Sequence, residues 1–310
     1  MAHKETDRLL GRMEKKISRE YSKAYRDVKK KADKYFLKFS QRDAEKKAQV
    51  LRGEMTYTDY LAWREGQMLV GKRWNDLRDS LAEDLSNANV IASQLINKET
   101  VDIYALNYNF GTYEIENGYH IDTSFVLVDH PTVERLLSDN PGIIPQASVN
   151  IPKDLLWNRQ KITSAVTQGI LQGESIPNIA KRLRSVTGMN QKAAIRNART
   201  YTTAAENGGR VDSYKRAQGM GIMLDQEWMA TLDGRTRISH RHLDGEVVPV
   251  GGVFSNGCKY PGDPDGAPEE IYNCRCTLVA KIRNYNYQDE PRFSRLSPGV
   301  SYEDWKRGKS

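Results

Sequence analysis

The chain has 310 residues, with 47 Lys and Arg against 40 Asp and Glu, and three cysteines. This length allows two domains that bury about 70% of the unfolded surface. A charged fraction of 28% and a mean hydropathy of −0.69 predict a soluble protein, and no apolar run approaches the ~20 residues that cross a bilayer. The start of the chain shows no apolar signal-peptide core, and three cysteines are too few for a disulfide framework. We therefore expect a protein made in the cytoplasm, with no membrane partner.

The positive charge is concentrated near the N-terminus. Residues 1–52 hold 17 Lys and Arg against 8 Asp and Glu, whereas residues 53–310 hold 30 against 32. Such a basic arm can bind double-stranded DNA without sequence preference, because neutralised phosphates release counterions. A long helix that solvates its outer face accounts for the same composition, and both interpretations stay open. The lysines considered for DNA contact are Lys15, Lys16, Lys29, Lys30 and Lys31.

Two long amphipathic helices are predicted in the first hundred residues. Apolar residues recur at intervals of three and four from Leu9 to Phe39, which places them on one stripe of a helix. A second helix is expected to begin near Thr58 as N-cap and to carry Trp74 and Leu81 on one face. Each apolar stripe needs a partner, either the other helix or another subunit.

The pattern of residue types changes after about Thr100. A tyrosine-rich stretch predicts a helix, and the β-branched run Thr123–Val128 predicts a strand. Proline and glycine then mark a linker, with a domain boundary near 145–155. The expected organisation is a helical N-terminal region with a basic arm and a short strand segment (1–150), a second domain (151–283) and a tail (284–310).

Three helices are expected after Pro152. Gly173 is expected to end the first, Ser175 to open the second, and Asn190 to cap the third after Gly188.

A small sheet should follow these helices. Short strands are expected at residues 222–231, 246–250 and 277–282, separated by turn-rich stretches. The tail 284–310 is expected to be extended or loosely ordered. The predicted fold class is therefore α+β, with long N-terminal helices followed by a helical and small-sheet C-terminal domain.

Functional side chains are densest between residues 228 and 276. Loops rich in such groups and in glycine usually mark either a site or a small domain in which a polar network replaces a large core. A second polar group lies upstream on the third predicted helix, at Arg196–Thr200 and Glu206–Asn207, and is interpreted as a solvated or packing stripe. The dense segment contains Asp233, Arg235, Arg237, His240, His242, Asp244, Asn273, Cys274, Arg275 and Cys276.

Three thiols and two imidazoles in this segment suggest zinc. His240, Cys258, Cys274 and Cys276 form an allowed Cys3His ligand set. The spacing Cys274-x-Cys276 departs, however, from the usual Cys-x2–4-Cys knuckle. In the metal-free alternative the cysteines pack as small apolar residues, and His240 and Arg275 bind carboxylates such as those of Asp233 or Asp244.

Catalysis is another interpretation of the same residues. His240 or His242 with Asp233 or Asp244 can form a general-base pair, and Cys274 is a candidate nucleophile. The spacings match no phosphodiesterase motif, and the glycines form no nucleotide-binding pattern. We therefore expect no catalytic residue.

Short motifs occur in a fixed order over roughly residues 155–282. Together they resemble the phage minor head, or head morphogenesis (Mu F-like), proteins over nearly half the chain. The motifs are Gln168-Gly169-Ile170, Ile179-Ala180-x-Arg182-Leu183, Ala198-Arg199-Thr200, Asn207-x-Gly209-Arg210, Trp228-x-Ala230-Thr231-Leu232-Asp233-x-Arg235-Thr236-Arg237, His240-x-x-Leu243-Asp244-Gly245, Tyr260-Pro261-Gly262-Asp263-Pro264 and Asn273-Cys274-Arg275-Cys276.

This resemblance implies a structural virion protein rather than an enzyme. It would be a minor capsid component, made in the host cytoplasm and located inside the head near the portal vertex. The implied partners are the portal protein, the major capsid or scaffolding protein and packaged double-stranded DNA, in capsid assembly, DNA packaging or genome delivery. If a metal binds, His240, Cys274 and Cys276 are the preferred ligands. The alternative is an effector delivered with the DNA or a metal-dependent hydrolase that uses the His, Asp and Cys cluster.

Overall fold

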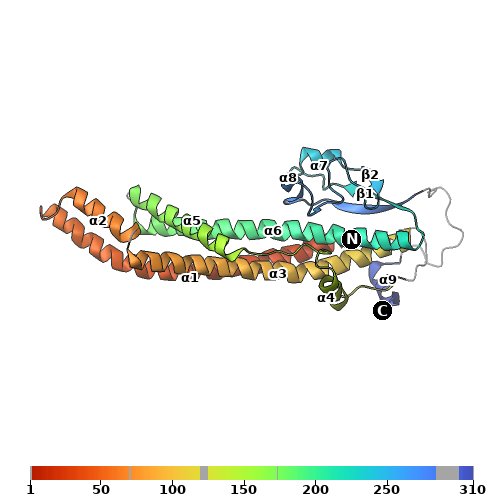
Figure 1. Cartoon of the computed structure of the whole chain (residues 1–310), viewed down its shortest axis with the longest axis horizontal. Coiled ribbons are helices and arrows are strands. Elements are labelled where there is room, and N and C mark those ends of the chain that lie inside the picture. The colour runs from red at the N-terminus through yellow and green to blue at the C-terminus, as the bar shows by residue number, and fades with distance from the viewer. Residues whose placement is uncertain (1, 70, 119–124, 173, 284–299, 310) are drawn as a thin grey trace. The chain divides into compact units, whose positions relative to one another are not determined.

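A computed structural model describes residues 2–69, 71–118, 125–172, 174–283 and 300–309 of the chain. The described part combines long helices with one small antiparallel sheet, as the predicted α+β class requires (Figure 1). None of its helices combines the length and apolar composition needed to cross a membrane. The elements are α1 (Ala2–Leu51), α2 (Tyr57–Leu69), α3 (Lys72–Gly118), α4 (His130–Asp139), α5 (Ile151–Leu171), α6 (Ile176–Gly219), β1 (Leu224–Met229), α7 (Ile238–His242), β2 (Val247–Pro249), α8 (Pro268–Ile271), β3 (Thr277–Ile282) and α9 (Tyr302–Lys309).

The chain forms two compact units, each discontinuous in sequence. The sheet unit comprises Met1–Glu14, Ile96–Ala147 and Arg196–Ser310, and the helical unit comprises Lys15–Leu95 and Ser148–Ile195. The crossing between Ala147 and Ser148 lies inside the expected linker. The other crossings lie within α1, α3 and α6, because these long helices contribute residues to both units.

The helical unit buries the apolar stripe of α1 against three other helices. Phe36 of α1, Trp74 of α3, Val166 of α5 and Leu183 of α6 belong to one core and are each at most 3% exposed. The spacing of three and four therefore gave the buried face of α1 correctly. In this unit the partner of the stripe is the chain itself.

Asn190 lies in the middle of α6 and is not an N-cap. Its side chain is buried and donates to Asn158 Oδ1 at 2.9 Å, while Asn89 Nδ2 donates to Asn190 Oδ1 at 2.8 Å. The helix also continues through Gly188, although a glycine inside a helix costs about 1 kcal/mol relative to alanine. The three helices predicted after Pro152 are therefore two, because tertiary contacts outweigh the local stop signals.

The second predicted helix also differs from the structure. Its N-cap is Thr56 instead of Thr58, since Thr56 Oγ1 accepts a hydrogen bond from the backbone N–H of Asp59 at 3.0 Å. The expected single helix is two helices, α2 and α3, which end and begin on either side of Gly71.

The strand predicted at Thr123–Val128 is wrong for its described part. Residues 125–128 form no strand, and residues 123–124 lie outside the described residues. The side chain of Asn109 forms hydrogen bonds with the backbone of Val128 instead. It donates to the Val128 carbonyl at 2.7 Å and accepts from the Val128 N–H at 2.8 Å. A side-chain amide thus replaces the neighbouring strand that the sequence pattern implied.

The three expected strands near the C-terminus are confirmed. The sheet order is β2-β1-β3, both pairs are antiparallel, and Leu224 pairs with Ile282 while Met229 pairs with Thr277. Leu224, Gln226 and Trp228 alternate onto the buried face of β1. This face packs with Tyr214 of α6 in one core of the sheet unit.

The expectation of an extended or loosely ordered tail is wrong for residues 302–309. These residues form α9, whose Tyr302 and Trp305 are buried in a cluster with Phe110 of α3. The Nε1–H of Trp305 also donates to Glu116 Oε2 at 2.6 Å. Residues 284–299 lie outside the described residues.

Gly209 lets α6 approach α3 closely within the sheet unit. A Cβ atom at this position would lie 2.6 Å from the carbonyl oxygen of Tyr104 and 3.0 Å from the backbone nitrogen of Tyr108. Real Cβ atoms essentially never approach another atom as closely as 2.6 Å, and both neighbouring atoms belong to backbone, which cannot easily move aside. Gly188 on the same helix has no heavy atom within 4 Å of the equivalent point.

We expect Gly209→Ala to lower the free energy of unfolding by about 1–3 kcal/mol, because the added methyl overpacks two helix backbones. Gly188→Ala is the matched control and should leave stability unchanged or raise it by about 0.5–1 kcal/mol, since glycine is unfavourable inside a helix. Denaturant unfolding of both variants measures the difference. Equal effects of the two substitutions would contradict the close approach.

Candidate functional site

A row of polar side chains on α6 holds the segment that leads into β3. Thr203 Oγ1 donates to the carbonyl of Cys274 at 2.6 Å, and Asn207 Nδ2 donates to the carbonyl of Cys276 at 3.2 Å. Asn207 Oδ1 accepts from the backbone N–H of Leu278 at 3.0 Å. The polar stripe predicted on this helix therefore packs against the sheet unit's own backbone.

Asp233 organises the turn after β1 and joins it to β3. Its carboxylate accepts two hydrogen bonds from the guanidinium of Arg275, both at 2.7 Å, and one from the backbone N–H of Arg235 at 2.8 Å. The Arg275 hydrogen bonds hold the pKa of Asp233 well below its usual range. The carboxylate partner predicted for Arg275 is thus present, whereas the Arg235 side chain is exposed.

Arg237 and Asn273 shape the loop beside this ion pair. The guanidinium of Arg237 donates to the carbonyl of Tyr272. Asn273 has a φ of 54°, in the left-handed region that asparagine tolerates better than most residues. Its backbone N–H donates to Thr200 Oγ1 at 3.3 Å. These contacts fix the backbone from which Cys274 and Cys276 project.

His240, Cys274 and Cys276 meet in the interior of the sheet unit. Nδ1 of His240 lies 3.6 Å from Cys274 Sγ and 3.4 Å from Cys276 Sγ, and all three residues are 2% exposed. Within the described part of the chain they form the one group of three or more His, Cys, Asp or Glu ligand atoms that lie within 4.8 Å of one another. We call them the Cys2His cluster.

Glu270 of α8 orients the imidazole. Its Oε2 lies 2.9 Å from His240 Nε2, and Asn256 Nδ2 donates to the same oxygen at 3.1 Å. When Nε2 carries the proton and donates to Glu270, Nδ1 presents its lone pair to the two sulfurs. Hydrogen bonds with Cys274 and His240 hold the pKa of Cys276 below its usual range, while the hydrogen bond to Cys276 and burial raise that of Cys274.

The general-base pairs considered from the sequence are not assembled. Asp233 is bound to Arg275, and Asp244 Oδ1 accepts from the backbone N–H of Ala230 at 2.8 Å. His242 is exposed, whereas His240 is bound to Glu270.

A cysteine next to a histidine that is bound to a glutamate is also the arrangement of a catalytic nucleophile, its general base and the carboxylate that orients the base. The cavity that all three residues of the Cys2His cluster line, however, measures only ≈ 20 Å³, which is room for about one water molecule. A larger cavity of ≈ 310 Å³ shares Cys274, Asn273 and Arg237 with it but is not lined by His240 or Cys276. Cys274 itself is 2% exposed, so little of it is accessible from that larger cavity.

Cys258 does not belong to the Cys2His cluster. It is buried in the same apolar core, next to Gly266, and burial raises its pKa to about 11. The structure thus brings together three of the four residues named for zinc. Sequence reasoning missed Glu270, which a spacing argument cannot find because its contact with His240 depends on how two loops fold back.

Four of the five lysines considered for DNA contact lie on the exposed face of α1. They are Lys15, Lys16, Lys29 and Lys30. Lys31 is half-buried, and its Nζ lies 2.6 Å from Asp84 Oδ2 and 2.9 Å from Ser80 Oγ. Lys31 is therefore an internal contact of the helical unit.

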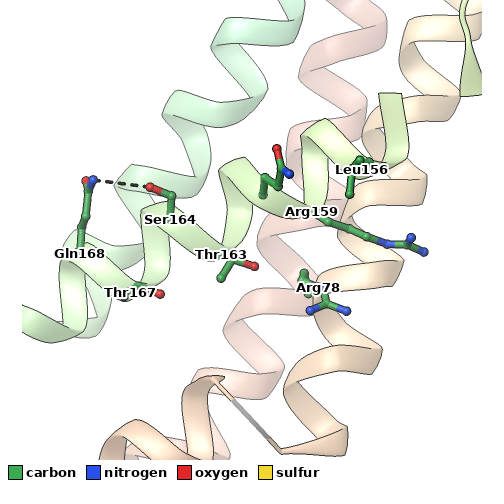
Figure 2. A pocket seen from close by; sticks show the side chains of 8 residues that line it. Arg78, Leu156, Arg159, Thr163, Ser164, Thr167 and Gln168 are labelled. Atoms are coloured by element: carbon green, nitrogen blue, oxygen red, sulfur yellow. Dashed lines mark hydrogen bonds between the residues drawn. The ribbon is translucent and has the colours of Figure 1, made fainter. Parts of the chain in front are cut away.

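A separate hollow of ≈ 560 Å³ lies in the helical unit between α3 and α5. Figure 2 shows Thr163, Ser164 and Thr167 of α5 along it, together with Arg78 of α3. No carboxylate, imidazole or thiol lines it. Its lining therefore offers none of the carboxylate, imidazole or thiol groups considered from the sequence.

Two of the comparisons with known proteins match phage proteins. The family described as Phage Mu protein F like protein matches residues 160–279. The minor head protein GP7 of Bacillus phage SPP1 is 25% identical over 98% of this chain and 94% of that protein. The resemblance stated from the motifs is therefore confirmed.

An enzyme is also among the similar proteins. The NAD(+)--arginine ADP-ribosyltransferase EFV of Enterococcus faecalis is 28% identical over 62% of this chain, but the alignment covers only 40% of that protein. An uncharacterized protein of Bacillus subtilis, YqbB, is 26% identical over 40% of this chain and 42% of that protein. No solved structure is significantly similar to the chain.

We expect Asp233→Asn to lower the thermal midpoint at pH 7 and to matter less in acid. The folded state depresses the pKa of Asp233, so its ionised carboxylate stabilises the fold above the unfolded pKa of about 4. That stabilisation is lost as the pH falls below this value. Thermal unfolding of both proteins between pH 7 and pH 3 should show the difference shrinking. Gly209→Ala, which changes no titrating group, is the control and should lose the same stability at each pH.

Proposed function

We propose that this chain, whose residues 160–279 match the family described as Phage Mu protein F like protein, is a minor component of a phage head that acts in head morphogenesis. The observation that carries this proposal is the near full-length similarity to a minor head protein. A match over a single motif or domain would leave the function of the whole chain open. Here the two chains correspond over almost their entire lengths.

The proposed location is the interior of the head near the portal vertex. The partners in this proposal are the portal protein and the major capsid or scaffolding protein, and the process is capsid assembly, DNA packaging or genome delivery. A minor component is present in fewer copies than the shell subunit, and the portal vertex is where a shell offers few equivalent positions. The location thus follows from the proposed role.

The exposed face of α1 supports contact with packaged DNA. Lys16, Arg19, Lys23, Arg26 and Lys30 follow one another at intervals of three and four and are all exposed. They form a basic row about 21 Å long at 1.5 Å per residue. Double-stranded DNA carries about one charge per 1.7 Å of axis, so a row of this length faces several phosphates.

This DNA contact is proposed to be independent of sequence. Lysine and arginine side chains on one helix face reach phosphates, which carry no sequence information. The opposite face of the same helix holds Ile17, Tyr21 and Val28 in the interior. The proposed DNA-binding surface is therefore the outer side of a core helix.

The proposed role is structural, not enzymatic. The similar ADP-ribosyltransferase shares with this chain less than half of its own length, which leaves most of that protein without a counterpart here. Cys274, the nucleophile considered from the sequence, is 2% exposed although it lines a cavity of ≈ 310 Å³, so a substrate would have little access to its thiol. These two observations favour a structural role over the delivered effector and the hydrolase.

Purified particles of the phage that encodes this protein should contain it at fewer copies than the major capsid protein. Quantitative mass spectrometry of mature heads and of their precursors measures the copy number. Cryo-electron microscopy of the portal vertex, with and without the protein, should show density that depends on it. Absence from both kinds of particle would contradict the proposed function.

Neutralising the basic row should weaken DNA binding. In Lys23→Gln/Arg26→Gln/Lys30→Gln, the slope of log K against log salt for a random duplex should fall by about 0.9 for each lost phosphate contact. Deleting residues 1–52 is unsuitable, because the deletion also removes buried side chains such as Phe36.

The matched control removes the same three charges elsewhere on the helical unit. Lys153, Lys181 and Lys192 are exposed on α5 and α6, and their replacement by Gln changes the net charge equally. Unchanged affinity in the control would show that position, not total charge, matters. Equal loss in both triple variants would contradict a DNA-binding face on α1.

A further inference from the structure

We infer that His240, Cys274 and Cys276 bind one zinc ion, with water as the fourth ligand. The site lies in the sheet unit and is independent of the proposed role in the phage head.

Both nitrogen–sulfur distances in the Cys2His cluster are close to those of tetrahedral zinc. Bonds of about 2.3 Å to sulfur and about 2.0–2.1 Å to nitrogen place the nitrogen about 3.5–3.6 Å from each sulfur. Nδ1 of His240 lies 3.6 Å from Cys274 Sγ and 3.4 Å from Cys276 Sγ. One lone pair on Nδ1 can accept a single S–H bond, so only one sulfur at a time can donate to the imidazole, and the second sulfur then has the first as its partner. An ion between the three atoms satisfies all of them together.

The imidazole has the partner that histidine ligands usually have. A ligating histidine generally donates its second ring N–H to a carboxylate or carbonyl, which fixes the tautomer and raises the basicity of the ligating nitrogen. Glu270 Oε2 lies 2.9 Å from Nε2 and is itself held by Asn256. The backbone N–H of Cys276 also donates to Cys274 Sγ at 3.5 Å, a hydrogen bond of the kind that stabilises a thiolate.

Space for a fourth ligand exists on one side of the cluster. A cavity of ≈ 20 Å³ is lined by all three ligand residues, by Asn273 and by Arg237. About 10–15 Å³ of such volume holds one water molecule. Cys258 lies outside this group of ligand atoms, so the site has three protein ligands and one solvent position.

The donor set selects zinc over the common hard cations. Two thiolates and one imidazole are soft or borderline donors, whereas Mg²⁺ and Ca²⁺ take oxygen ligands. Zn²⁺ replaces the two thiol protons, which pass to solvent, and the ion with two thiolates and a neutral imidazole has no net charge. A neutral complex fits a site in which all three residues are 2% exposed.

The bound ion would join three parts of the sheet unit. His240 comes from α7, Cys274 and Cys276 lead into β3, and Glu270 comes from α8. These segments have short elements and many turns, so few backbone hydrogen bonds hold them to one another. The bound zinc would therefore stabilise the loops of the sheet unit.

The test uses the full chain, expressed without a histidine tag in medium supplemented with zinc. Elemental analysis should find one zinc per chain. Cobalt(II) exchanged into the site should give the visible absorption of a tetrahedral thiolate complex. Removal of the metal by a chelator should lower the thermal midpoint, and added zinc should restore it. Protein that contains no zinc and gives no cobalt spectrum would overturn the inference.

Variants distinguish these ligands from other sets. Cys276→Ser and His240→Gln should lose the metal, and Cys258→Ser should keep one equivalent. Glu270→Gln should still bind zinc but about 10–100-fold more weakly in competition with a chelator. The Glu270 variant keeps every ligand, so it decides the matter even if the ligand variants fail to fold. Loss of zinc from Cys258→Ser, or unchanged affinity in Glu270→Gln, would contradict the assigned site.

Discussion

The contact between α6 and the segment leading into β3 positions nearly everything else in the sheet unit. In the sheet, β3 pairs with β1 on one side only. Asn207 and Thr203 of α6 form hydrogen bonds with backbone groups of residues 274–278. A buried carbonyl or N–H without a partner costs about 1–3 kcal/mol, so these side chains set where the segment can lie. The two thiols face His240 because this segment is fixed. Gly209 belongs to the same arrangement, since it allows α6 to reach α3 while its polar side chains reach β3.

Access decides which chemistry the Cys2His cluster can perform. A thiol beside an imidazole that a carboxylate orients is, by composition, equally a nucleophile with its base and a set of metal ligands. Nucleophilic catalysis needs a thiol that a substrate can reach, and Cys274 and Cys276 are each 2% exposed. The cavity that all three residues share holds about one water, and a metal ion needs no more room than that. The same three residues therefore fit a bound ion better than a cysteine hydrolase.

The sequence predicted local periodicity well and long-range partners poorly. The buried stripe of α1 and the three strands follow from intervals of 3.6 and 2 residues, which each segment carries by itself. Asn190 and Gly188 show the opposite case, because the buried contacts of Asn190 with Asn158 and Asn89 keep one helix intact through two stop signals. At the site, the grouping of His240, Cys274 and Cys276 could be predicted from residue type. The contact of Glu270 with His240 and the position of Cys258 outside the cluster could not be predicted, because both depend on how loops fold back on the sheet.

The two faces of α1 constrain how the chain can contact DNA. Its apolar stripe is part of the core of the helical unit, with Val28 and Phe36 at most 2% exposed. The basic row opposite therefore lies on an ordered helix, and its lysines and arginines keep a fixed spacing. A flexible basic arm can place its charges on any phosphate, but it loses conformational entropy when it binds. A fixed row has less to lose and matches only a limited set of phosphates, so each charge in it contributes according to its position. Removing three charges from α1 can therefore weaken DNA binding more than removing three charges from α5 and α6. The net charge of the protein changes equally in both cases.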